Sequence, residues 1–205
     1  MLACLTRTFL PVSIAIAGLA APALAQEQTP PPAATNSNVF VFGGVYSSES
    51  VGETFNFIGT DYQDAYMLGG GYQHFFLGAE NGFQAGLEAG AALRKGPGVS
   101  GEAWAGVVLR SDGFIKNDHV KISASITGGL SLITDPLDVE VAREISRDGD
   151  STFLFYMAPE ISISAADNPN MEAFWRVQHR SGGWNTLGHM GEGANANTLG
   201  VRWKF

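Results

Sequence analysis

Strict alternation of apolar and polar side chains is the feature of this sequence that most restricts its fold. In the segment GFQAGLEAGAALRKG, Phe83, Ala85 and Leu87 alternate with Gln84 and Glu88. Successive side chains of a β-strand point to opposite faces, so this segment predicts a strand with one apolar face. The same pattern returns in HVKISASITGGLSLIT, TFLFYMAPEISISA and NTLGVRWKF.

The alternation predicts eight strands and leaves little room for long helices. The expected strands cover residues 38–48, 64–77, 82–94, 101–110, 119–133, 152–165, 171–181 and 194–205. The connections after the second, fourth and sixth strands are short turns, whereas three of the other four are long. An even strand number with long loops at one end is typical of an outer-membrane barrel. A soluble sandwich or a lipocalin-like barrel would show the same alternation.

Charges of both signs lie on the polar faces of these segments and favour the membrane barrel. Within a narrow barrel they could pair with one another; they are Glu88, Arg94, Glu102, Arg110, Lys121, Glu160, Glu172, Arg176 and Arg202. The chain ends in GVRWKF, which resembles the C-terminal assembly signal of bacterial outer-membrane proteins. We therefore expect an all-β, eight-stranded antiparallel barrel in the bacterial outer membrane. Phe205 would contact the assembly machinery and end in the periplasm.

The start of the chain has the pattern of a secretory signal. Residues 1–25 contain Arg7, an apolar run and the cleavage-site sequence Ala23-Leu24-Ala25. Residues 26–38 form a Pro-rich leader that we expect to be flexible, and residues 39–205 form the barrel domain. Cleavage would remove the one cysteine and one arginine, so the formal charge changes from −8 to −9. This acidity argues against nucleic-acid binding.

The segment WRVQHRSGGWNTLG carries the residues best suited to chemistry. His179 and Ser181 share the face of Trp175 and Val177, which the barrel interpretation turns toward lipid near the outer leaflet. A neutral imidazole beside a serine hydroxyl can act as a general base and create a nucleophile. The backbone N–H groups of the next two residues, Gly182 and Gly183, are candidates for an oxyanion hole.

The sequence QHRSGGWNTLGHMGEGANANTLGVRWKF resembles the C-terminus of the PagL-type lipid A 3-O-deacylases. This family consists of eight-stranded outer-membrane barrels that hydrolyse an ester-linked acyl chain of lipid A. The resemblance implies that His179 is the base and Ser181 the nucleophile. The family's third member is a Glu: Glu192 is the nearest acid, whereas Asn195 fits better when the last strand is aligned from its end. Gly182 departs from the family, which usually has Asn there.

Two functions follow from these observations. The first is a serine esterase that needs no cofactor or metal and acts on the lipid A of lipopolysaccharide in the outer leaflet. The second is a non-catalytic barrel of the OmpX or surface-antigen type with a structural or adhesive role. The sequence is compatible with a homodimer in either case. Several aromatic residues are candidates for the girdles that flank a membrane: Trp104, Tyr156, Trp175, Trp184 and Trp203.

Overall fold

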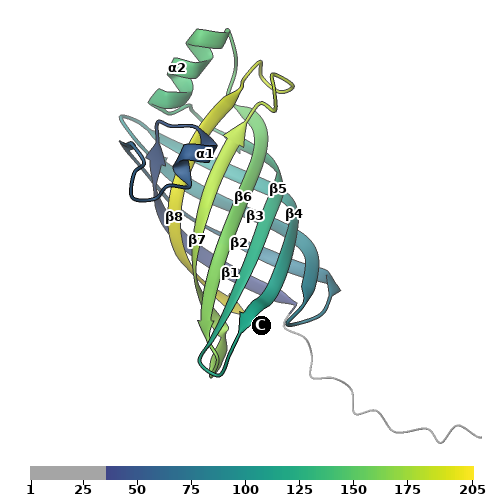
Figure 1. Cartoon of the computed structure of the whole chain (residues 1–205). Helices are drawn as coiled ribbons and strands as arrows, with labels where there is room; N and C mark the ends of the chain where they lie inside the picture. The colour runs from purple at the N-terminus through teal and green to yellow at the C-terminus, as the bar shows by residue number, and fades with distance from the viewer. Residues whose placement is uncertain (1–35) are drawn as a thin grey trace, which may run out of the picture. The chain divides into compact units, whose positions relative to one another are not determined.

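The computed structural model describes residues 36–205, which form one closed antiparallel barrel of eight strands (Figure 1). Each strand pairs with its neighbours in sequence, and β1 pairs with β8 to close the sheet. The expected fold class is confirmed. The strands are β1 (Ser37–Ser47), β2 (Tyr62–Gly78), β3 (Phe83–Lys95), β4 (Val99–Lys116), β5 (Val120–Ile133), β6 (Phe153–Ala165), β7 (Asn168–Ser181) and β8 (Glu192–Lys204).

Two helices lie in the long connections, where the sequence predicted only loops. Helix α1 (Val51–Thr54) follows β1, and helix α2 (Asp138–Arg147) follows β5. In α2 the Glu140 side chain accepts a hydrogen bond from the Leu137 N–H at 2.9 Å, which satisfies a backbone donor at the start of the helix. Figure 1 shows α2 at the end of the barrel opposite the C-terminus.

The observed strand ends lie within three residues of the expected ones, except at the end of β4. The turn predicted at residues 111–118 is shorter, because β4 continues to Lys116 through a bulge after Ser111. Asp112 alternates in phase with the inward-facing Arg110, and its carboxylate binds Lys121 Nζ at 2.6 Å. The barrel also begins at Ser37, two residues before the expected domain boundary. The predicted signal peptide and most of the leader lie outside the described residues and stay predictions.

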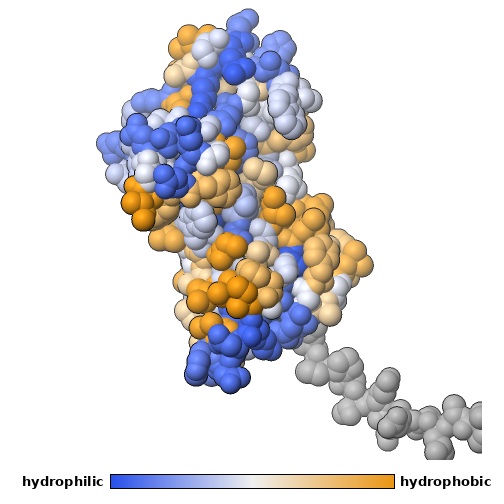
Figure 2. Space-filling model, viewed as in Figure 1, coloured by the Kyte–Doolittle hydropathy of each residue, from blue (hydrophilic) through white to orange (hydrophobic). Residues whose placement is uncertain are grey.

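The outer wall of the barrel is apolar, as the alternation predicted. Figure 2 shows hydrophobic residues around the middle of the barrel and hydrophilic ones toward both ends. The shortest strand, β1, has 11 residues, enough to cross a bilayer as a tilted strand. None of the helices in residues 36–205 is long and apolar enough to cross a membrane. Exposed side chains of the wall include Val41, Leu68, Leu87, Val107, Leu130, Ile161 and Leu199.

The lumen holds a network of buried ion pairs that includes all nine charged residues expected there. Arg176 lies at its centre, with its guanidinium 2.8 Å from Glu88 and 2.9 Å from Glu160. Glu160 also binds Arg202 at 2.6 Å. Buried charges are tolerated only when they are paired and hydrogen-bonded, so this network requires the polar faces of the strands to point inward.

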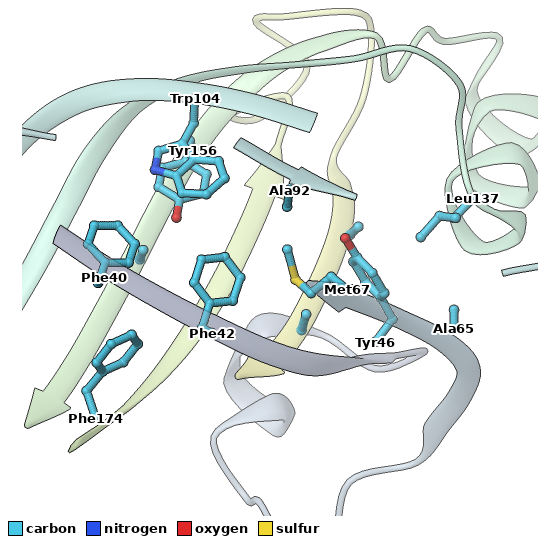
Figure 3. Close-up of a cluster of buried hydrophobic side chains, with 13 residues drawn as sticks. Phe40, Phe42, Tyr46, Ala65, Met67, Ala92, Trp104, Leu137, Tyr156 and Phe174 are labelled. Carbon is cyan, nitrogen blue, oxygen red and sulfur yellow. The ribbon is translucent and has the colours of Figure 1, made fainter. Parts of the chain in front are cut away.

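Aromatic side chains fill the remaining lumen (Figure 3). Trp104 stacks on Tyr156 with ring centroids 5.4 Å apart, and Phe40 packs edge-on against Phe174. The placement of Trp104 and Tyr156 in a membrane girdle was therefore wrong. Trp104 alternates in phase with Glu102 and therefore shares the inward face of β4. Its indole Nε1–H donates a hydrogen bond to the Glu88 carboxylate at 2.8 Å. A side-chain-filled lumen of this kind leaves no wide aqueous channel.

Replacing Arg176 by Met should destabilise the barrel strongly, because it leaves the buried charge of Glu88 without an ion-pair partner and leaves Glu160 with Arg202 alone. Breaking a buried pair in this way costs about 3–5 kcal/mol of unfolding free energy. The measurement is urea unfolding in lipid vesicles, followed by tryptophan fluorescence. Lys95→Met is the matched control, since Lys95 is exposed and should change the unfolding free energy by only about 0.5 kcal/mol. Equal unfolding free energies for the two variants would contradict the network's role.

Candidate active site

The two candidate catalytic residues lie on the outer face of β7, at the end of the strand just before the loop that connects it to β8. His179 is opposite Met157 of β6, and Ser181 is opposite Phe155. Arg180, between them, points into the lumen, where its guanidinium donates to Ser131 Oγ at 2.8 Å. His179 and Ser181 thus share one face of β7, opposite to the inward face of Arg180, as predicted. The site lies at the end of the barrel that carries α2.

Asn195 of β8 is the residue that contacts the imidazole. It stands directly opposite His179 in the β7–β8 register, and its Oδ1 lies 2.6 Å from His179 Nδ1. The Asn195 Nδ2 donates to the Glu49 carbonyl at 2.7 Å. This second bond identifies the amide nitrogen and leaves Oδ1 as the acceptor for the imidazole. His179 Nδ1 therefore carries a hydrogen, and in the neutral ring Nε2 is the acceptor.

Glu192, the other candidate for the third residue, lies behind Asn195. Its Oε2 is 3.4 Å from Asn195 Nδ2, and its Oε1 accepts from the Val51 N–H at 3.0 Å. None of the hydrogen bonds found within residues 36–205 joins Glu192 to His179. The two candidates thus occupy different places: Asn195 holds the ring, and Glu192 holds Asn195 and the start of α1.

The first long loop, residues 48–61, packs on the outer face of the barrel beside the site. Besides the Glu49 contact, the Thr54 carbonyl accepts from Asn197 Nδ2 at 2.9 Å. Phe55 packs edge-on against Trp175, 6.1 Å away. Figure 1 shows α1 lying against β8. His179 is only 7% exposed in consequence, although its face of the strand is the outer one.

Arg143 of α2 connects loop 48–61 with β8 through hydrogen bonds. Its guanidinium donates to the carbonyls of Gly193 at 2.8 Å and Ser48 at 3.1 Å, and it lies 3.5 Å from the Glu192 carboxylate. Burial lowers the pKa of Arg143, while the negative charge of Glu192 opposes that shift. Sequence reasoning missed Arg143 because its helix was expected to be an unstructured loop.

Ser181 is partly exposed, and its hydroxyl has no hydrogen bond to His179 among the contacts of residues 36–205. Side chains at i and i+2 share a face, and strand residues use more than one χ1 rotamer. Rotation of the two side chains can therefore bring the hydroxyl toward Nε2. Catalytic hydrogen bonds are often long before substrate binds.

The two glycines after Ser181 differ in what their backbones can donate. The Gly182 N–H donates to the Gly191 carbonyl at 2.7 Å, so the prediction that it faces an oxyanion was wrong for this conformation. Gly183 adopts φ +57°, a left-handed conformation that favours glycine. A Cβ there would lie 2.7 Å from the Phe155 ring. Its N–H has no backbone acceptor within residues 36–205, so Gly183 remains the candidate donor.

The described part of the chain offers no ready metal centre. Within residues 36–205, no three His, Cys, Asp or Glu side chains are grouped so that they could hold a metal ion. The groups that the structure brings together at the candidate site are a serine hydroxyl, an imidazole and a carboxamide.

The comparisons with known proteins find similar barrels but no sequence family. No family model matches the sequence, and no curated protein matches it. The structure is similar to that of the outer-membrane enzyme PagL, with a TM-score of 0.54, 13% identity and coverage of 82% of this chain and 99% of that one. Neisserial surface protein A gives a TM-score of 0.48, 15% identity and coverage of 82% and 96%. The N-terminal barrel domain of Pseudomonas aeruginosa OprF gives a TM-score of 0.45 and 13% identity, and the match covers 83% of this chain and 98% of that one.

The likeness to the PagL structure shows the fold. A closed sheet leaves no unpaired strand edge, and its apolar outer wall is suited to lipid, the two conditions for spanning a membrane with β-structure. The chain is an eight-stranded barrel of the bacterial outer membrane.

Proposed function

We propose that this protein is an outer-membrane esterase that removes the ester-linked acyl chain at the 3 position of lipid A. The observation that carries the proposal is the bond between His179 and Asn195 on the outer wall, beside Ser181. An oriented imidazole next to a serine is the arrangement needed for nucleophilic catalysis. A position on the lipid-facing wall, at the end of the barrel that carries the long loops, suits a substrate whose esters lie in the outer leaflet.

Because Asn195 holds the hydrogen on His179 Nδ1, the lone pair of Nε2 is the base in the reaction. Nε2 of His179 accepts the proton of the Ser181 hydroxyl as the oxygen attacks the ester carbonyl. The tetrahedral intermediate collapses when the sugar alkoxide leaves with that proton, and the acyl chain stays on Ser181. Water, deprotonated by the same imidazole, then releases a fatty acid and restores the serine. The Gly183 N–H is the group available to stabilise the oxyanion.

Asn195 orients the imidazole but carries no charge to offset the imidazolium that forms during each step. A buried carboxylate normally serves both purposes in a Ser-His-Asp triad. Here the nearest carboxylate, Glu192, approaches through Asn195 and pairs with Arg143 at 3.5 Å. We therefore assign the orienting role to Asn195 and a supporting one to Glu192.

A second function remains open, that of a structural or adhesive barrel. Two features favour it: the Ser181 hydroxyl is not bonded to His179, and the loops expose large apolar side chains. Trp184 is 99% exposed and Ile145 is 79% exposed. Both are positioned to contact another surface, and this role would require no activity at Ser181.

Expression of the wild-type protein in a host with hexa-acylated lipid A should yield lipid A that lacks one 3-hydroxyacyl chain. Ser181→Ala and His179→Ala should leave the lipid A intact, because each removes a reacting group. The measurement is mass spectrometry of extracted lipid A, with heat-modifiable gel migration to verify folding. Intact lipid A in cells that contain folded wild-type protein would contradict the esterase and support the structural role.

The third residue can be assigned with two further variants. Asn195→Ala should lower the deacylation rate by about 10²-fold or more, because the imidazole loses its orienting partner. Glu192→Gln should lower it less than tenfold, because the single carbonyl oxygen of glutamine can still accept from the Val51 N–H and only the 3.4 Å contact with Asn195 Nδ2 is lost. Asn195→Asp keeps an acceptor for His179 Nδ1 but turns its second carboxylate oxygen toward the Glu49 carbonyl and the Glu192 carboxylate, so its rate should lie between those of the wild type and Asn195→Ala. A larger loss for Glu192→Gln than for Asn195→Ala would contradict the assignment.

A further inference from the structure

Loop 48–61, which covers the candidate site, carries an exposed apolar segment of its own. Phe55 is 44% exposed, Phe57 is 46% exposed and Ile58 is 97% exposed. In Figure 2, hydrophobic side chains lie along the edge of this loop that faces the middle of the barrel, and hydrophilic ones lie toward α2. Exposed apolar side chains that are grouped in this way mark an interaction site.

The apolar segment of the loop lies against the middle of β7. The rings of Phe55 and Phe57 pack edge-on against Trp175, with ring centroids 6.1 Å and 6.5 Å away. Trp175 is the eighth of the 14 residues of β7. It stands opposite two exposed residues of the outer wall, Ile161 and Leu199. The loop therefore extends along the wall to the level of side chains that face lipid.

The level of Trp175 lies within the membrane. The 14 residues of β7, at about 3.3 Å each and tilted by about 40°, rise about 35 Å along the barrel. The apolar band of an outer-membrane barrel is about 25 Å tall. Wherever such a band lies along the strand, it includes the midpoint of the strand and hence Trp175. The side chains that pack on Trp175 are thus beside acyl chains on their open side.

The backbone of the loop is paired in the way that an apolar surrounding requires. Irregular backbone is tolerated at membrane depth only where protein groups satisfy its hydrogen bonds. The Asn56 carbonyl accepts from Thr60 Oγ1 at 2.8 Å, and the Phe57 carbonyl accepts from the Tyr62 hydroxyl at 2.8 Å. The Thr54 carbonyl is bound by an amide of β8, as described above. These carbonyls need no water, so the segment can lie in hydrocarbon.

We infer that loop 48–61 inserts its apolar segment into the outer leaflet, with Phe57 and Ile58 among the acyl chains. The inserted surface is continuous with the outer wall, which contacts the bilayer on its own account. Its partner is therefore the hydrocarbon of the surrounding lipid. Transfer of these side chains from water to hydrocarbon is favourable, and it holds the loop against β7 and β8.

Insertion of the loop also supports the candidate site, and this part of the inference rests on the proposed function. The Glu49 carbonyl, near the start of the loop, accepts from Asn195 Nδ2 and so fixes the amide that orients His179. A loop that lipid holds against the wall keeps this carbonyl in place. A loop that leaves the wall would leave Asn195 free to rotate.

A spin label on Ile58→Cys tests the insertion directly. The variant also carries Cys4→Ser, which removes the one native cysteine of the chain. The labelled protein, in vesicles of phosphatidylethanolamine and phosphatidylglycerol, is exposed to oxygen, which concentrates in hydrocarbon, and to a polar nickel chelate, which stays in water. Leu199→Cys on the outer wall is the lipid reference. Ile145→Cys, on α2 beyond the end of the barrel, is the water reference.

The ratio of oxygen to chelate collisions is measured by power saturation in electron paramagnetic resonance. It should be about tenfold higher at Ile58 than at Ile145, because hydrocarbon excludes polar solutes, and it should match the ratio at Leu199. A ratio at Ile58 equal to that at Ile145 would overturn the insertion. Low accessibility to both reagents, together with crosslinking between barrels, would assign the segment to a second copy of the chain and would also overturn it.

Ile58→Asp tests the effect of insertion on the site. A carboxylate is unfavourable among acyl chains, so the loop should leave the wall, and deacylation of lipid A should slow about tenfold. Ile145→Asp is the matched control and should leave the rate unchanged, with heat-modifiable gel migration to verify that both variants fold. Equal rates for the two variants would overturn the support of the site. A lipid-inserted label without any deacylation by the wild type would overturn the esterase and keep the insertion.

Discussion

The buried ion pairs of Arg176 with Glu88 and Glu160 are the constraint on which the rest of this barrel depends. Charges withdrawn from water cost several kcal/mol each unless partners surround them, and outside the lumen the only environment is lipid. The network therefore fixes which face of each strand points inward. In β7, an inward Arg176 and Arg180 require an outward His179 and Ser181. The lipid-facing position of the candidate site thus follows from the pairing of charges in the lumen.

The same kind of pairing extends to the loops. Glu140 of α2 enters the end of the barrel and pairs there with Arg94 and Arg180. This anchors α2, so that Arg143, one turn further along, reaches the carbonyls of loop 48–61 and of β8. That loop in turn holds Asn195 through the Glu49 carbonyl. An uninterrupted series of contacts connects the lumen charges with the imidazole of His179.

Much of the fold could be predicted from the sequence, because alternation is a local property with a period of two. It placed all eight strands, the lumen charges and the outward face of His179 and Ser181. Trp104 could have been placed in the lumen by the same reasoning, since it alternates in phase with Glu102. The parity of β8 also favoured Asn195, although distance along the chain favoured Glu192.

The parts that could not be predicted depend on contacts between residues distant in sequence. Loop 48–61 bonds to residues more than 140 positions away, such as Asn195 and Asn197, and nothing local in its sequence specifies those partners. The donor properties of Gly182 and Gly183 depend on the fold of the loop that follows β7. Helix α2 is stabilised by Glu140 inside the barrel, a contact that its own sequence does not show.

The central claim is that Asn195 orients His179 so that Ser181 becomes a nucleophile on the lipid-facing wall. The most direct test is reaction of the folded, membrane-inserted protein with a lipophilic fluorophosphonate, in which a serine oxygen displaces fluoride from phosphorus. Peptide mass spectrometry should find the phosphonyl group on Ser181 and should find none there in His179→Ala. A folded wild-type barrel in which Ser181 stays unlabelled, or labels equally well without His179, would contradict the account.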